Sequence, residues 1–483
     1  MQENYIINNC KLDNHQMKLV LDNNNSFVIA GAGSGKTLTI LGKVNYLIEN
    51  KICNPENILL ISFTNASVND LKRKIIYNVN IYTFHKLAMH ILEMNNFSYN
   101  LCDNYMIKYL IKEYVIMCNN YEQKTIIKFL KLNMSFNSFL NSKNFISFCN
   151  FIETFINLYK TNNVNADTIL KIKYNFLEKK ILLIILKIYK LYIIEKNSTN
   201  SLDFDDLIII ATKFVNKIKL NYKYIIIDEF QDTSFIRLNL IRKIYEQENS
   251  KIIVVGDDWQ SIYRFSGCDL MLFLNFPKFF SNVNKIKLIN TYRNSQELIN
   301  IASIFVQKNP YQIKKNLISK KNNLTPLILV PYKNKIETFK KLLNYIIKKS
   351  TNILVLSRNN KDIFSYIDSD FLFEHDYLKY KNIEIKYLTV HKSKGLEADY
   401  VIILNCNDEF LGFPNKIENN KIIEKLFPSE QISFSEERRL FYVAITRCKE
   451  ITYLIYDVHK PSIFVKEIKK IIKKELGKIT YFN

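Results

Sequence analysis

The sequence predicts an α/β protein with two parallel-sheet lobes and an all-helical insertion in the first lobe. Short apolar runs with the character of buried strands fall into two groups, and each run of the first group is followed by a polar loop and then a helical pattern. The first group comprises residues 27–30, 58–62, 224–227 and 252–255. The second group comprises residues 286–289, 353–357, 385–389, 400–404 and 451–456.

A long stretch between the second and third strands has a different character. Residues 91–199 contain almost no glycine or proline and repeat Ile, Leu, Phe and Tyr at helical spacing. We therefore expect residues 91–199 to form the helical insertion. Residues 1–90 together with 200–285 should form the first lobe, and residues 286–483 the second lobe.

The chain carries a large positive charge. Its 483 residues include 68 Lys and Arg against 46 Asp and Glu, which gives a formal net charge of +22. This charge suits a polyanionic partner such as nucleic acid, because counterions are released on binding. An AT-rich genome also over-supplies Lys, Asn and Ile, so the charge alone does not identify the partner.

Composition indicates a cytoplasmic protein that does not enter a membrane. The eight cysteines form no C-x-x-C pair and show no zinc-ligand spacing, which favours reduced thiols. The amino-terminal residues lack the basic and apolar regions of a secretory signal. The most apolar helical stretch, residues 181–194, contains two lysines and is too short to cross a bilayer, so we expect a core helix there.

Residues 30–37 read AGAGSGKT directly after an apolar run, which is the pattern of a strand, a phosphate-binding loop and a helix start. The glycines let backbone N–H groups point at an anion, and the helix N-terminus adds its dipole. Lys36 is expected to neutralise the β- and γ-phosphates of ATP, and Thr37 to hold Mg²⁺. A chance glycine turn is the alternative, but three of the nine glycines lie within five positions. The predicted nucleotide-binding residues of this loop are Ala30, Gly31, Ala32, Gly33, Ser34, Gly35, Lys36 and Thr37.

Two later strands end in polar residues that complete such a site. Asp228 and Glu229 follow the third strand; we expect Asp228 to bind Mg²⁺ and Glu229 to orient and deprotonate the attacking water. An exposed acidic turn is the alternative. Gln260 follows the fourth strand in a position suited to sensing a γ-phosphate. Tyr263 and Phe265 then offer aromatic faces for the bases of a single strand, although buried core aromatics would give the same pattern.

Two arginines of the second lobe follow apolar segments. Arg293 lies in TYRN and Arg447 in ITRCK. The planar, permanently charged guanidinium suits a γ-phosphate, whereas an ordinary surface ion pair is the alternative for either residue alone.

Taken together, these motifs resemble the UvrD/Rep branch of superfamily 1 DNA helicases, and within it the bacterial helicase IV type. The resemblance extends over nearly the whole chain outside the helical insertion, and AGAGSGKT is the family's own form of the loop, Ala30 included. The other matching segments are LDNHQ, ISFTNASVNDLKRKI, TFH, LDFDDLI, IIIDEFQDTS, GDDWQSIYRFSGCDL, TYRN with QKNPYQIKK, TVHKSKGLEADYVII and EERRLFYVAITRCK.

The resemblance implies two RecA-like lobes and assigns roles to residues. It implies that Gln16 reads adenine, Tyr292 stacks on adenine, and Glu397 touches the ribose. It implies that Arg293 and Arg447 are γ-phosphate fingers. His391 fits a DNA contact and a structural histidine equally well. The DNA contacts implied by the resemblance are Phe63, Thr64, Thr83, His85, Tyr263, Phe265 and His391.

The implied activity is ATP- and Mg²⁺-dependent 3′→5′ movement on single-stranded DNA or at single/double-strand junctions, by a monomer that works with repair or replication proteins. Only 98 residues separate Arg293 from His391, too few for the helical subdomain that larger members insert there. Because Gln16 lies almost at the start, we also expect the chain to lack the amino-terminal extension of helicase IV. We therefore expect the protein to translocate along a single strand, rather than to unwind a duplex efficiently without a partner. The alternatives are an RNA-directed helicase and an ATP-gated module that displaces a machine such as RNA polymerase from nucleic acid.

Overall fold

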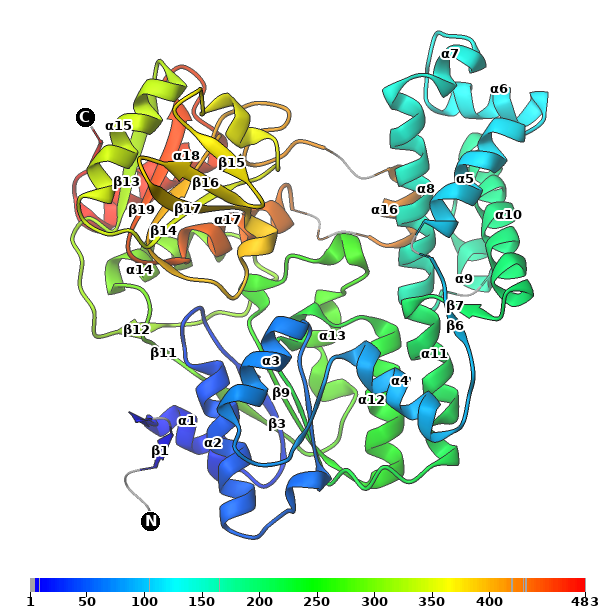
Figure 1. Ribbon diagram of the computed structural model, residues 1–483, viewed down its shortest axis with the longest axis horizontal. Helices are drawn as coiled ribbons and strands as arrows, with labels where there is room; N and C mark the ends of the chain where they lie inside the picture. The colour runs from blue at the N-terminus through cyan, green and yellow to red at the C-terminus, as the bar shows by residue number, and fades with distance from the viewer. Residues whose placement is uncertain are drawn as a thin grey trace.

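The computed structural model describes residues 5–7, 9–103, 105–164, 166–417, 420–428, 430 and 432–482. The ends of the predicted lobes, residues 1–4 and 483, lie outside the described residues. Figure 1 shows three bodies: a first lobe in blue and green, a second lobe in yellow to red, and a column of cyan helices beside them.

The first lobe is built on a six-stranded parallel sheet. Its strand order is β10-β3-β9-β8-β4-β5. The strands are β3 (Asn25–Ile29), β4 (Ile58–Ile61), β5 (Asn80–Tyr82), β8 (Tyr224–Ile227), β9 (Lys251–Gly256) and β10 (Val283–Lys287). Strands β3, β9 and β8 are neighbours, and the three predicted phosphate-site segments follow their carboxyl ends. In an open parallel sheet this edge is where ligands bind.

The structure corrects one predicted strand. Residues 286–289 were expected to belong to the second lobe, but β10 pairs in parallel with β3 from Val283 opposite Asn25 to Lys287 opposite Ile29. An apolar run predicts a strand but not the strand with which it pairs. That pairing depends on which sheet edge the folded chain places beside it. The short segment after the first sheet, β11 (Asn290–Thr291), pairs with β12 (Ile318–Ser319).

Helices cover both faces of the first sheet, and each face has its own hydrophobic core. One face packs on α4, α11 and α12, the other on α1, α2 and α3. A short pair, β1 (Ile6–Ile7) and β2 (Cys10–Lys11), precedes α1. The helices are α1 (Asn14–Leu21), α2 (Lys36–Glu49), α3 (Asn65–Lys74), α4 (Phe84–Met94), α11 (Phe204–Phe214), α12 (Phe235–Glu248) and α13 (Leu270–Leu274).

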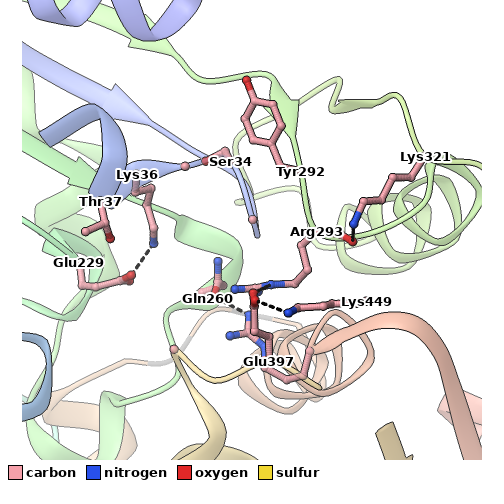
Figure 2. Close-up of a pocket in the computed structure, with 14 residues that line it drawn as sticks. Ser34, Lys36, Thr37, Glu229, Gln260, Tyr292, Arg293, Lys321, Glu397 and Lys449 are labelled. Atoms are coloured by element: carbon pink, nitrogen blue, oxygen red, sulfur yellow. Dashed lines mark hydrogen bonds and ion pairs between the residues drawn. The ribbon is translucent and has the colours of Figure 1, made fainter. Parts of the chain in front are cut away.

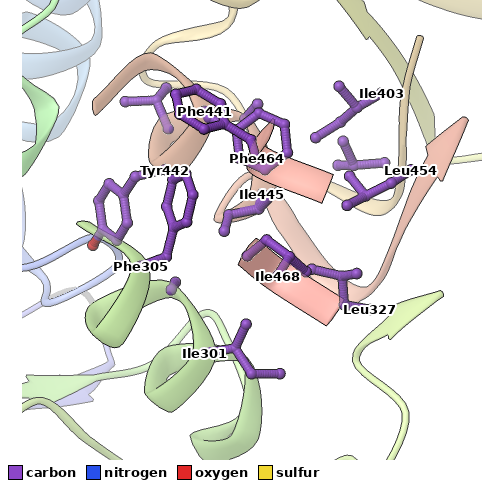
Figure 3. Close-up of a cluster of buried hydrophobic side chains, with 14 of the residues drawn as sticks. Ile301, Phe305, Leu327, Ile403, Phe441, Tyr442, Ile445, Leu454, Phe464 and Ile468 are labelled. Atoms are coloured by element: carbon purple, nitrogen blue, oxygen red, sulfur yellow. The ribbon is translucent and has the colours of Figure 1, made fainter. Parts of the chain in front are cut away.

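The second lobe has a seven-stranded sheet in the order β13-β19-β18-β14-β17-β16-β15. Its first five strands are parallel, and β16 and β15 continue it antiparallel. Its helices α14, α17 and α18 pack their apolar side chains together in the core of Figure 3. The elements are β13 (Leu327–Tyr332), β14 (Ile353–Ser357), β15 (Leu372–Glu374), β16 (Tyr377–Tyr380), β17 (Ile383–Thr389), β18 (Ala398–Ile403), β19 (Cys448–Asp457), α14 (Gln296–Val306), α15 (Lys335–Ile347), α17 (Ser435–Ile445) and α18 (Ile463–Leu476).

The helical insertion stands on a short strand pair and a buried ionic cluster. Strands β6 (Asn100–Leu101) and β7 (Ser201–Leu202) pair where the chain leaves and re-enters the first lobe. Asp203 caps α11 and also binds Lys196 at 3.0 Å and the ammonium of Lys160. These lysines come from α10 and α8, so α11 and the insertion share one set of charges. The helices are α5 (Met106–Met117), α6 (Asn120–Phe129), α7 (Phe136–Leu140), α8 (Lys143–Thr161), α9 (Ala166–Lys171) and α10 (Phe176–Ser198).

Within the part of the chain that the structure describes, we find no helix of the length and apolar character needed to cross a membrane.

A segment of the second lobe joins the core of the insertion. Helix α16 (Lys421–Leu426) lies beside α8 in Figure 1, far from the sheet that its chain leaves. Ile422 and Ile423 are buried in the insertion's hydrophobic cluster, and Lys425 pairs with Glu178 of α10 at 2.5 Å. This docking was not predicted, because the three apolar residues of α16 match any amphipathic helix.

The two lobes also share a core. Trp259, in the turn after β9, is fully buried in the second lobe's hydrophobic cluster. Its ring meets the ring of Tyr442 on α17 edge-on, with centroids 5.4 Å apart. The loop after β9 is therefore fixed between the lobes.

Candidate active site

A polar cleft of about 360 Å³ lies between the lobes at the carboxyl edge of the first sheet. The first lobe supplies the phosphate loop, Glu229 and Gln260, and the second lobe supplies most of the cations (Figure 2). The cleft is lined by Gly33, Ser34, Gly35, Lys36, Thr37, Glu229, Gln260, Tyr292, Arg293, Lys321, Gly395, Glu397, Arg447 and Lys449.

The phosphate loop has a geometry that only glycine accommodates at two positions. Gly33 and Gly35 have φ of +70° and +74°, in the left-handed region. A Cβ on Gly33 would lie 2.6 Å from the Cβ of Arg293, and a Cβ on Gly35 would lie 2.6 Å from Nε2 of Gln16. The hydroxyl of Ser34 is buried and has no hydrogen-bond partner among the described residues. Helix α2 begins at Lys36, so this cradle lies at a helix N-terminus and suits an anion.

Lys36 and Glu229 face each other across the cleft floor. Lys36 Nζ lies 2.5 Å from Glu229 Oε1, and Glu229 Oε2 accepts a hydrogen bond from Gln231 at 2.5 Å. Burial raises the pKa of Glu229, but Lys36 and Lys394 outweigh this and hold the pKa below its usual range. Glu229 also has a left-handed φ of +53°, which is strained for a non-glycine residue and typical of functional sites.

The predicted metal ligands lie beside this pair. Thr37 lines the cleft, and Asp228 is buried one residue before Glu229. Burial and the neighbouring Glu229 both raise the pKa of Asp228. Among the residues that the structure describes, no three or more His, Cys, Asp or Glu side chains cluster to hold a metal. Thr37 and Asp228 could hold Mg²⁺ only together with phosphate oxygens, which is the usual arrangement for this ion.

The opposite wall carries the two predicted arginine fingers. Arg447 is buried and donates to Gln260 Oε1 at 3.0 Å, so the first lobe's sensor contacts the second lobe's arginine directly. Arg293 donates to Glu397 at 2.8 Å, and Lys449 pairs with the same carboxylate at 3.0 Å. Glu397, predicted to touch a ribose, is thus held between two cations.

The predicted base-binding residues lie at the outer end of the cleft. The amide of Gln16 donates to the carbonyl of Ser34 at 3.4 Å, and the ring of Tyr292 is half exposed. Asp13 joins them: it caps the helix that carries Gln16 and accepts from the Tyr292 hydroxyl at 2.6 Å. The ring of Tyr292 approaches Gly35 from the second lobe.

Three predicted strand contacts form one aromatic cluster between the lobes. The ring of Phe265 is 57% exposed and lies 6.2 Å from Tyr263 and 5.5 Å from His391, measured between ring centroids. The Tyr263 hydroxyl donates to the carbonyl of His391 at 2.9 Å. Burial, and then Arg358, lowers the pKa of His391 to about 4. Phe265 therefore offers an open face, while Tyr263 and His391 support it.

The other four predicted contacts lie on the first lobe. Thr64 and Thr83 cap α3 and α4, accepting from Ser67 and Lys86 backbone N–H groups at 3.1 and 3.3 Å. Phe63 precedes one cap and stacks edge-on against Phe84, with centroids 5.4 Å apart. His85 follows the other cap and packs against Phe204, 5.1 Å between centroids.

Several residues of the site lay outside the predicted set. Lys321 and Lys449 line the cleft, and the chain's many lysines hide such positions. Lys394 lies in the HKSKG segment, which was a usable signal; it bonds Asp232 and the Gln260 carbonyl. Arg237 lies 5.2 Å from the centroid of the Phe63 ring and donates to the Asp232 carbonyl at 3.1 Å. Arg237 thereby links the Phe63 ring to Asp232, the same residue that Lys394 contacts.

Known proteins match most of the chain. Residues 12–281 match the UvrD/REP helicase N-terminal domain, and residues 372–459 match the UvrD-like helicase C-terminal domain. DNA helicase IV of Escherichia coli strain K12 is 28% identical over 487 residues, covering 94% of this chain and 70% of that protein. A probable DNA helicase II homolog of Mycoplasma capricolum is 29% identical over 351 residues, covering 70% of this chain and 46% of that protein. The ATP-dependent DNA helicase Rep of Buchnera aphidicola subsp. Schizaphis graminum is 27% identical over 518 residues, covering 96% of this chain and 71% of that protein.

The first of these matches alone takes in more than half of the 483 residues. It contains the phosphate loop, Glu229 and Gln260, which line the cleft from the first lobe, and the buried Asp228 beside them. The second match contains Glu397, Arg447 and Lys449 of the opposite wall. The chain belongs to the UvrD/REP helicase family.

Proposed function

We propose that this ATP-dependent DNA helicase moves along one strand of DNA in the 3′→5′ direction, driven by ATP hydrolysis in the cleft between its lobes. The observation that carries the proposal is the joint lining of one cleft by Lys36 of the first lobe and by Arg293 and Arg447 of the second. Hydrolysis that needs both walls couples the nucleotide to the distance between the lobes.

Two cations of the cleft, Lys36 and Arg293, have carboxylate partners that a phosphate oxygen can replace. Lys36 exchanges Glu229 for the β- and γ-phosphates, which frees the Glu229 carboxylate to take a proton from the attacking water. Arg293 exchanges Glu397 for the γ-phosphate, while Lys449 keeps that carboxylate in place. Mg²⁺ held by Thr37 and Asp228 would neutralise charge on the phosphates.

Strand binding connects to the same cleft through the loop after β9. Gln260 lines the cleft, and three residues further on Tyr263 supports the exposed Phe265 ring. Lys394 contacts the Gln260 carbonyl at 2.8 Å and lies 5.2 Å from the Tyr263 ring centroid. Bases that stack on Phe265 would therefore contact the same loop that positions Gln260 and could shift it. The capped N-termini of α3 and α4 would bind backbone phosphates, through Thr64 and Thr83.

The test is ATP turnover with single-stranded DNA, duplex DNA and RNA of matched length. Single-stranded DNA should stimulate turnover most, and Lys36→Ala should abolish turnover while single-strand binding persists. Lys321→Ala is the matched control, because Lys321 lines the cleft from the other lobe and donates to a backbone carbonyl at 3.2 Å. We expect a much smaller effect there. Normal turnover by Lys36→Ala would disprove the role of the loop.

Strand polarity needs a separate measurement. Streptavidin displacement from biotin placed at either end of a single strand should show release from the 5′ end only. Equal stimulation by RNA would favour the RNA-directed alternative. Turnover independent of any strand, with capture of a nucleic-acid-bound machine, would favour the displacement module. We place the enzyme in the cytoplasm, as a monomer serving repair or replication; the eight cysteines are free thiols, as that compartment favours.

A further inference from the structure

The segment that follows α14 runs from the second lobe to the underside of the phosphate loop. The Ile313 N–H donates to the Asp258 carboxylate at 2.7 Å, and the Trp259 indole donates to the Ile313 carbonyl at 3.1 Å. Leu317 lies against Gly31, where an added Cβ would come within 2.5 Å of the leucine side chain. Residues 313–317 are thereby docked on the phosphate loop and on the loop after β9 together.

Lys315 lies at the centre of this segment and is buried, with 4% of its surface exposed. Its ammonium donates to the Ala30 carbonyl at 2.8 Å and pairs with Asp257 at 2.5 Å and Asp258 at 2.6 Å. The same Nζ lies 4.7 Å from the Trp259 ring centroid. Three oxygen acceptors match the three donors of an ammonium, so the position of this charge is fixed.

A chain of buried contacts leads from Lys315 to the arginine finger. Asp257 accepts from Gln260 Nε2 at 2.5 Å through the carboxylate oxygen that does not contact Lys315. The other end of that amide, Oε1, accepts from Arg447 at 3.0 Å. The amide of Gln260 is thereby oriented by a carboxylate on one side and a guanidinium on the other. Asp257, Gln260 and Arg447 are all buried, so water does not compete for these bonds.

We propose that Lys315 is a positioning residue for ATP hydrolysis: it holds Asp257, which sets the Gln260 amide and through it the Arg447 guanidinium at the cleft. This inference deepens the proposed function and rests on it. Asp257 and Asp258 place two buried negative charges side by side, and without the ammonium their carboxylates must move apart or take up protons. A displacement of about 1 Å in a catalytic arrangement can cost about 10²-fold in rate.

The experiment compares Lys315→Arg in the native chain and in a Gln260→Ala background. Arginine keeps the charge, but its planar fork does not match the three acceptors around an ammonium. In the native chain kcat should fall by about 10²-fold, while the Kd for ATP changes less than about threefold. In the Gln260→Ala background the same substitution should lower kcat by less than about threefold, because the amide through which it acts is gone.

Lys43→Met is the matched control. Lys43 of α2 is also fully buried in the first lobe, where it donates to the carbonyls of Val20 and Asp22 at 3.0 and 2.5 Å. Lys43→Met should lower the melting temperature and leave kcat unchanged.

If Lys315→Arg does not fold, the double variant Lys315→Met, Asp258→Asn takes its place in the same comparison, because it keeps the net charge of the cluster.

Three results would overturn the role of Lys315: equal losses of kcat in both backgrounds, a loss of ATP affinity alone, or a loss of melting temperature alone. Wild-type turnover is measured in parallel. A wild-type chain without strand-stimulated turnover would overturn the proposed function, and the role of Lys315 with it. Normal wild-type turnover with any of the three results above would overturn the role of Lys315 alone.

Discussion

Two of the predicted strand contacts, His85 and His391, are partly buried histidines whose pKa values are lowered in the folded chain. Burial, followed by Arg237, lowers the pKa of His85 to about 4, and burial followed by Arg358 lowers that of His391 to about 4. Both side chains lie against aromatic rings, Phe204 for His85 and Phe265 for His391. A neutral imidazole can stack or donate one hydrogen bond, but it adds no positive charge for phosphates at neutral pH.

These lowered pKa values predict a pH-dependent stability. An unfolded histidine has a pKa of about 6.5, so between about pH 4 and 6.5 the unfolded chain binds more protons than the folded chain. The contribution of each histidine to the free energy of unfolding should therefore fall as the pH falls through this window, by up to about 1.4 kcal/mol per pH unit. Urea unfolding of the wild type, His85→Gln and His391→Gln at pH 4.5, 5.5 and 6.5 measures the free energy of unfolding of each protein and so tests this prediction.

The prediction concerns the difference between wild type and variant, because other groups titrate in the same window. Burial raises the pKa of Asp232 to about 6, for example, and this group acts with the opposite sign. The wild type should gain stability relative to each variant as the pH rises from 4.5 to 6.5. Parallel curves for wild type and variant would show that the histidine titrates alike in the folded and unfolded chains.

At the scale of elements, the phosphate loop joins β3 to α2 and touches both lobes. Gly33 brings the loop against Arg293 and Thr291 of the second lobe. Gly35 caps α2 in a left-handed conformation against Gln16 of α1. These elements can therefore approach so closely because glycine, which has no side chain, stands at both positions.

Gly33→Ala should weaken ATP binding by roughly 5- to 30-fold, because its Cβ would displace Arg293 and the loop would have to leave its φ of +70° to relieve a strain of about 1–2 kcal/mol, which distorts the phosphate cradle. The Kd for an ATP analogue, measured by titration calorimetry, tests this. Gly477→Ala is the matched control: Gly477 has φ +74° with nothing within 4 Å of the added Cβ. It should cost about 1–2 kcal/mol of stability and leave the Kd unchanged. A similar change of Kd in both variants would show that backbone strain anywhere in the chain weakens ATP binding, and that the contact of Gly33 with Arg293 is not the cause.

The elements that the sequence predicted are those with strong local signals. Strands β4, β8, β9 and β14 each contain a continuous run of four apolar residues, as is typical of buried parallel strands. Strand β13 was not among the predicted strands, although four apolar residues precede Pro331. The proline is tolerated because β13 ends the hydrogen-bonded order of the sheet. The antiparallel β15 and β16 are exposed on alternate residues and carry no such run.

At the scale of the whole molecule, three bodies are joined at two shared cores. Trp259 anchors the loop after β9 in the second lobe, and α16 anchors the second lobe in the helical insertion. A movement of the second lobe would therefore reach the insertion through α16. Arg264, one residue after Tyr263, donates to the carbonyl of Phe427 at 2.6 Å and reinforces this junction.

Ile422→Ala should loosen the insertion although Ile422 lies over two hundred residues from it in sequence. The side chain is fully buried in the insertion's cluster, and such truncations cost about 2–5 kcal/mol. Hydrogen exchange of α8 and α10 should become faster. Ile417→Ala is the control, because Ile417 is 61% exposed in the same segment, and exchange should stay as in the wild type. Unchanged exchange in Ile422→Ala would show that α16 does not support the insertion.

The phosphate loop, the two acidic residues after β8, most central strands and the helical character of the insertion follow from local patterns in the sequence. These features depend on residues adjacent in the chain, where glycine placement, apolar runs and helical spacing act directly. The tertiary structure alone decided that β10 joins the first sheet, that α16 enters the insertion and that Lys315 lies under the phosphate loop. Each of these is a contact between distant segments, whose partners are chosen by the burial and charge that the folded surfaces offer one another, and a local pattern does not contain that information.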